Sequence, residues 1–172
     1  MLIIVAGSGR SESKSFKVAL HYRKLLSDKG IETDLLSLEE LPDDIIFHSL
    51  KGQPSQRLDE LIDSRVKPHE KLIFIMPEFN GSFPGLLKLF LDACDKDLFR
   101  GKKAALIGIS AGRAGNLRGM DHLTNILHHI GIEVLSNKIP ISSIDKIITT
   151  AGFENEETEK VLIRQIDQFL KF

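Results

Sequence analysis

The stretch that decides the fold is Leu72–Lys88, which reads LIFIMPEFNGSFPGLLK. Its first five residues are apolar and end at Met76, a pattern typical of a strand buried on both faces of a sheet. The loop that follows must bend at its glycines while it presents Asn80, Ser82 and free backbone amides, which suits a flat ligand. Pro84 then fixes φ for the start of a helix. We therefore expect a binding loop at the carboxyl end of a central strand, where open α/β sheets bind their ligands.

Other short apolar runs share the character of that strand, and longer amphipathic stretches separate them. The predicted strands are 2–6, 31–38, 72–76 and 104–109, with 132–135 and 139–141 as candidates for the fifth. The predicted helices are 15–27, 58–66, 84–94, 117–130 and 158–169. This alternation predicts an α/β fold, a five-stranded parallel sheet with helices on both faces. The polar stretch 47–57 is expected to be mobile or to contact another subunit.

Composition limits the classes of function. The 172 residues are 42% hydrophobic and 27% charged, with a formal net charge of −1, which is too balanced to favour a nucleic-acid partner. We expect residues 1–172 to form one domain. The single cysteine, Cys94, has no partner for an internal disulfide. The N-terminal stretch lacks the layout of a signal peptide, and no apolar run reaches the roughly 20 residues of a membrane helix, so a cytoplasmic protein without membrane contact is expected.

The loop after the first predicted strand, residues 7–15, combines two glycines, four serines and Arg10 directly before a helix. Hydroxyl groups, a helix N-terminus and a guanidinium together form a phosphate-binding site. The alternative is an ordinary N-cap provided by Ser13 or Ser15. The dinucleotide-binding fingerprint is not supported, because Glu12 stands where its third glycine is needed.

A third loop, residues 110–118, again places small residues and hydrogen-bond donors between a strand and a helix. In a parallel sheet, the loops after the first, third and fourth strands reach the same edge. A phosphate at the first loop and a planar ring between the other two would match flavin mononucleotide (FMN). The strand order 2-1-3-4-5 of flavodoxin-like sheets would put FMN at the switch point between the first and third strands.

Three motifs in these loops resemble those of the NADPH-dependent FMN reductase family of flavodoxin-like proteins. The first, G-S-x-R-x-x-S-x-N, is matched at Gly7, Ser8, Arg10 and Ser13, with Ser15 in place of the asparagine. The second, P-E-Y-N-G-S-x-P-G-x-L-K-N, is matched at Pro77, Glu78, Asn80, Gly81, Ser82, Pro84, Gly85, Leu87 and Lys88. The third, a small-residue loop before G-G-x-R, is matched at Gly115 and Arg118, with Asn116 in place of a glycine.

The resemblance implies a flavodoxin-like three-layer α/β/α sandwich with FMN as its cofactor. It assigns the FMN phosphate to Ser8, Arg10, Ser13 and Ser15. It lays the isoalloxazine ring along Pro77, Glu78, Phe79, Asn80 and Gly81, with Ser110, Gly112 and Arg113 closing the other side. The chain departs from the family pattern at Phe79, which replaces a tyrosine, at Leu89, which replaces an asparagine, and at Ala93, where a tryptophan is common.

The function implied is an FMN-dependent NAD(P)H oxidoreductase that passes a hydride from NADPH or NADH to N5 of FMN and electrons to a flavin, a quinone or another small acceptor. Backbone amides near Asn80 and Gly81 are expected to stabilise the charge of the reduced ring, with no dedicated catalytic acid or base. A flavodoxin-like FMN-binding electron carrier or sensor is the alternative.

The resemblance also implies a homodimer or homotetramer, paired through the helix that follows Pro84. A metal site is not expected, because His122, His128 and His129 do not have the i, i+4 spacing that zinc sites favour.

Overall fold

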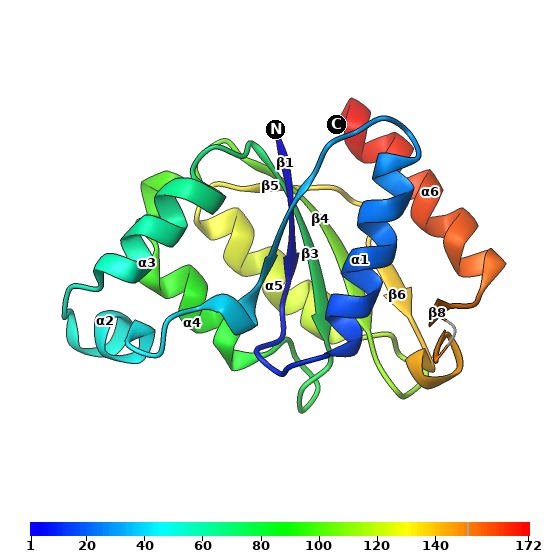
Figure 1. The fold of residues 1–172 in the computed structure, drawn as a ribbon, viewed down its shortest axis with the longest axis horizontal. Coiled ribbons are helices and arrows are strands. Elements are labelled where there is room, and N and C mark those ends of the chain that lie inside the picture. Colours follow the sequence, from blue (N-terminus) through cyan, green and yellow to red (C-terminus); the bar gives the residue numbers. More distant parts are fainter. Residues whose placement is uncertain (151) are drawn as a thin grey trace.

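A computed structural model describes residues 1–150 and 152–172. Its main sheet has the parallel order β2-β1-β3-β4-β5, which confirms the predicted order and the flavodoxin-like fold (Figure 1). The strands are β1 (Leu2–Ala6), β2 (Asp34–Ser37), β3 (Lys71–Pro77), β4 (Lys103–Ile109) and β5 (Glu133–Val134). A further strand, β6 (Ile139–Ile141), also pairs with β4, and a small hairpin joins β7 (Ile148–Thr149) to β8 (Gly152–Phe153).

The helices form a layer on each face of the sheet (Figure 1). Helices α1 (Lys14–Ser27) and α6 (Glu156–Lys171) cover one face. The other face carries α2 (Ile45–Lys51), α3 (Gln56–Leu61), α4 (Gly85–Ala93) and α5 (Leu117–His129). Short turns of 3-10 helix are η1 (Leu38–Glu40), η3 (Lys96–Leu98) and η4 (Ile144–Lys146), and η2 (Ile62–Val66) is a π-helix. None of these helices in the described residues has the length and apolar character needed to cross a membrane.

The continuous apolar strands have two buried faces, as predicted. Along β1, Ile4 packs into the core beneath α1 and α6, whereas its neighbours Ile3 and Val5 pack into the core beneath α4 and α5. The same alternation holds in β3, where Ile73 and Phe74 point to opposite cores and are fully buried. Burial of both faces explains why these strands contain no alternating polar residues.

The structure departs from the predicted elements in the last strands of the sheet and in the helices between β2 and β3. The two candidates for the fifth strand are both paired with β4: β5 runs beside Lys103 and Ala104, and β6 runs beside 107–109. Helix α2 was not predicted, and it occupies part of the stretch 47–57 before ending at Gly52, whose φ is 64°. The predicted helix 58–66 is a short α3 continued by the π-helix, from which Arg65 reaches back to the edge strand β2.

Candidate functional site

The three predicted loops follow β1, β3 and β4, which are neighbours in the sheet, so the loops meet at one edge (Figure 1). Side-chain contacts connect the three loops. The guanidinium of Arg10 lies 4.6 Å from the centre of the Phe79 ring, joining the first loop to the second. The Asn116 side chain donates a hydrogen bond of 3.0 Å to the Pro77 carbonyl, joining the third loop to the second. The structure therefore brings residues from all three motifs together.

The serines of the first loop include the cap of the helix that follows. Ser13 is the N-cap of α1 and accepts a hydrogen bond of 3.2 Å from the Phe16 amide, so the capping role is present. Ser15 is buried beside it, with 3.0 Å between the two hydroxyl oxygens, and the buried Ser8 hydroxyl accepts a bond from the Arg10 amide. The Arg10 side chain remains exposed at the N-terminus of a 14-residue helix. Capping thus explains Ser13. The exposed Arg10 and the N-terminus of α1 together form a positively charged helix end that attracts anions.

The second loop is a tight hairpin. The amide of Phe79 donates to the Ser82 carbonyl at 2.8 Å, and the Ser82 amide donates back at 3.0 Å. The two residues between them, Asn80 and Gly81, have φ values of 51° and 80°. Positive φ at both central positions is the signature of a type I′ turn, for which asparagine followed by glycine is the preferred pair. The sequence therefore fixes the shape of this loop locally.

The hydrogen bonds of this hairpin select which backbone groups remain available to a ligand. The Glu78 amide donates to the Ile109 carbonyl at 2.9 Å, and the Phe79 amide is used within the turn. Within residues 1–150 and 152–172, the amides of Asn80 and Gly81 make no hydrogen bond. Of the five predicted residues in this loop, these two alone can offer an amide to a bound ring, because Pro77 has no N–H.

The third loop is held by its own serine. The buried Ser110 hydroxyl donates to the Gly112 carbonyl at 2.9 Å and accepts from the Gly115 amide at 2.9 Å. The Gly112 carbonyl also accepts from the Ser143 amide. These bonds leave Gly112 and Arg113 exposed at the loop tip. Ser110 therefore shapes the loop, while the tip residues are the ones that face outward.

Asn116 is a residue of this site that the sequence analysis did not assign. Its side chain is 1% exposed, and its Nδ2 donates to the carbonyls of Met76 at 3.3 Å and Pro77 at 3.0 Å. Its backbone is left-handed, with φ of 62°. In the sequence it stands where the family pattern has a glycine, so the motif alone indicated a departure and not a contact.

Polar side chains of α5 also contact the hairpin. The Ser82 hydroxyl lies 2.9 Å from Nδ1 of His122, and the half-buried Glu78 carboxylate lies 3.8 Å from the guanidinium of Arg118. Within the described residues, no group of three or more histidine, cysteine or acidic side chains could hold a metal ion.

Cys94 lies at the end of α4, and burial raises the pKa of its thiol to about 12. It is therefore a packed side chain and not a reactive one.

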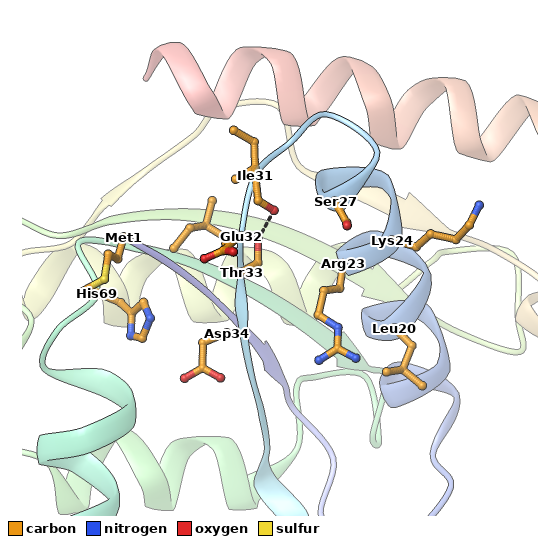
Figure 2. Close-up of a pocket in the computed structure, with 11 residues that line it drawn as sticks. Met1, Leu20, Arg23, Lys24, Ser27, Ile31, Glu32, Thr33, Asp34 and His69 are labelled. Atoms are coloured by element: carbon orange, nitrogen blue, oxygen red, sulfur yellow. Dashed lines mark hydrogen bonds between the residues drawn. The ribbon is translucent and has the colours of Figure 1, made fainter.

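A groove of about 740 Å³ lies at the other end of the sheet, between α1 and the edge strand β2. Figure 2 shows Arg23 of α1 and Asp34 of β2 projecting into the same space, with His69 near Met1. Arg65 holds both oxygens of Asp34, at 2.8 and 2.9 Å. None of the twelve predicted residues lines this groove. Open α/β sheets bind ligands at the carboxyl ends of their strands, so the three loops remain the candidate site.

Comparisons with known proteins agree with this geometry. A family model described as NADPH-dependent FMN reductase matches residues 1–145. An NAD(P)H-dependent FMN reductase of Pseudomonas aeruginosa is 29% identical over 97% of the chain and 91% of its own length. A 2-hydroxy-1,4-benzoquinone reductase of a Burkholderia species is 23% identical over 98% of the chain and 93% of its own length. The solved structure of FerB, an NAD(P)H:acceptor flavoenzyme of Paracoccus denitrificans, superposes with a TM-score of 0.81 at 27% identity, covering 99% of the chain and 94% of FerB.

Proposed function

The chain belongs to the NADPH-dependent FMN reductase family, and from this premise we propose that it is an FMN-dependent NAD(P)H oxidoreductase. The observation that carries the proposal is that the amides of Asn80 and Gly81, at the tip of a type I′ turn, make no hydrogen bond within the described residues. They lie in the loop whose Phe79 ring contacts Arg10, the cation at the start of α1. An anion-binding helix end beside a wall of backbone donors fits a phosphorylated ring cofactor.

We assign the residues as follows. Arg10 and the N-terminus of α1 would bind the FMN phosphate, with Ser8, Ser13 and Ser15 shaping that loop. Asn80 and Gly81 would direct their amides at the polar edge of the ring, where preorganised dipoles stabilise negative charge. Pro77, Glu78 and Phe79 would support that wall, and Ser110, Gly112 and Arg113 would close the opposite side.

When bound, FMN would supply the redox chemistry, accepting a hydride from NADPH or NADH and delivering electrons to an acceptor. The chain's own contribution is to bind and orient, because the groups proposed to contact FMN are the backbone amides of Asn80 and Gly81 and the guanidinium of Arg10. The acceptor we propose is a small molecule such as a quinone or a free flavin. The relative named as a benzoquinone reductase supports a quinone.

The test is spectroscopic. The purified protein, reconstituted with FMN, is expected to show the visible spectrum of a bound flavin, and anaerobic NADPH or NADH is expected to bleach it. Arg10→Ala removes the proposed phosphate ligand and its contact with the Phe79 ring, so it is expected to weaken FMN binding. Bound flavin that neither nucleotide reduces would point to an electron carrier or sensor. Failure to bind FMN after reconstitution would reject the whole proposal.

We further propose that residues 1–172 act as a single FMN-binding domain in a cytoplasmic homodimer or homotetramer. Exposed apolar side chains on α2 support the assembly: Ile46, Phe47 and Leu50 are 50%, 46% and 72% exposed. An apolar surface of this kind is typical of a protein–protein contact. Light scattering is expected to give a mass of two or four chains, and Phe47→Glu is expected to lower it. A monomer at micromolar concentration would contradict the assembly.

A further inference from the structure

The peptide between Pro77 and Glu78 is fixed from both sides by the neighbouring strand and loop. Its carbonyl oxygen accepts from Asn116 Nδ2 at 3.0 Å, and its N–H donates to the Ile109 carbonyl at 2.9 Å. The preceding carbonyl, that of Met76, accepts from the same Asn116 amide. The hairpin that presents Asn80 begins directly after this peptide. The peptide that leads into the hairpin is therefore held by the Asn116 side chain of the third loop together with the Ile109 carbonyl of β4.

The surroundings of Asn116 are built to hold this side chain. Asn116 adopts a left-handed backbone that asparagine tolerates better than most residues. A Cβ atom on Gly119 would overlap Asn116 Oδ1, and one on Gly108 would lie 3.0 Å from Asn116 Cβ. Asn116 Oδ1 is buried and has no hydrogen-bond partner in the described part of the chain. In this position the side chain leaves its oxygen without a partner, which costs free energy, while its amide group donates to two carbonyls.

We propose that Asn116 is a positioning residue that fixes the second loop for FMN, and that it acts through the Pro77–Glu78 peptide. With the carbonyls of Met76 and Pro77 tied inward, the turn holds the amides of Asn80 and Gly81 outward before any ligand arrives. Such preorganisation lowers the ordering cost of binding. That the ligand is FMN rests on the proposed function. The role of Asn116 in the loop geometry rests on the hydrogen bonds alone.

The variant Asn116→Gly tests this role with little backbone strain, because glycine adopts positive φ freely. We expect the dissociation constant of FMN, measured by quenching of flavin fluorescence, to rise about tenfold, which corresponds to about 1.4 kcal/mol. The midpoint potential of the bound flavin is expected to shift. Without FMN, hydrogen exchange of the Glu78 amide is expected to become about tenfold faster. Asn116→Asp is the second variant, since it keeps the shape but sets an acceptor against two carbonyls.

Gln165 provides the matched control. It is fully buried, and its Nε2 also donates to two backbone carbonyls, those of Leu106 at 3.1 Å and Asn137 at 2.7 Å, within the α6 side of the core. Gln165→Leu is expected to lower the free energy of unfolding while leaving the FMN dissociation constant and potential unchanged.

The outcomes separate the two proposals. Asn116→Gly with FMN affinity within twofold of wild type, or with the same change as Gln165→Leu, would overturn the positioning role and leave the proposed function standing. Wild-type protein that binds no FMN would overturn the proposed function. If the wild type binds no FMN, hydrogen exchange of the Glu78 amide still tests the loop geometry. An unchanged exchange rate in Asn116→Gly would show that Asn116 does not hold the Pro77–Glu78 peptide.

Discussion

Substituting Gly115 by alanine should destabilise the protein because of two separate effects in the third loop. The φ of Gly115 is 57°, a conformation that costs a residue with a Cβ roughly 1–2 kcal/mol. The added Cβ would lie 2.6 Å from Cβ and 2.7 Å from the carbonyl carbon of Pro140, and 2.8 Å from the Ile141 nitrogen. Two of these atoms are backbone, so the overlap needs a main-chain shift, and such overpacking costs roughly 1–3 kcal/mol.

Together these effects predict that Gly115→Ala lowers the free energy of unfolding by about 2–5 kcal/mol and the melting temperature by roughly 4–20 °C for a chain of this size. Urea and thermal unfolding of the FMN-free protein measure both. Gly112→Ala, three residues earlier, is the matched control, because nothing lies within 4 Å of its added Cβ and its φ is not positive. Its stability is expected to stay within about 0.5 kcal/mol of wild type. Equal losses in the two variants, or no loss in Gly115→Ala, would refute this reasoning.

Three further predictions concern ionisable side chains. Arg10→Lys keeps the charge but loses the forked guanidinium and its contact with the Phe79 ring, so FMN titrations are expected to show roughly tenfold weaker binding than wild type. Unchanged affinity would argue against a phosphate ligand at this position. Burial alone would raise the pKa of Asp34, but the hydrogen bonds from Arg65 and from the backbone outweigh it and hold that pKa below its usual value of 3.8. The ionised pair should therefore stabilise the wild type relative to Asp34→Asn above about pH 4, and the difference in urea midpoint should shrink as the pH falls; a difference that persists at pH 2 would contradict this. The Cys94 thiol, with its pKa raised to about 12 by burial, is expected to react with a disulfide reagent only in denaturant, and rapid reaction of the native protein would show that the end of α4 opens.

The sequence was sufficient where local rules decide the structure. Apolar runs identified the central strands, and the pair Asn80 and Gly81 fixes a type I′ turn without help from the rest of the chain. Helix α2 was missed because its exposed apolar residues, such as Leu50, give no clear amphipathic pattern without the core that Ile45 packs against. The role of Asn116 could not be predicted either, since its contact with Pro77 joins residues 39 positions apart.

The departures from the family pattern differ in what they affect. Phe79 has lost a hydroxyl, but its contact with Arg10 uses the face of the ring, which phenylalanine retains. Leu89, which replaces an asparagine, packs against the core beneath α4, and Ala93, which replaces a tryptophan, lies within that core. Both substitutions therefore affect packing. Ser15, which replaces an asparagine, contacts Ser13 within its own loop, whereas Asn116 adds hydrogen bonds that join two loops, at a position where the family has a residue without a side chain. If this enzyme binds FMN differently from its relatives, the physical origin is therefore expected at position 116 before positions 79, 89 or 93.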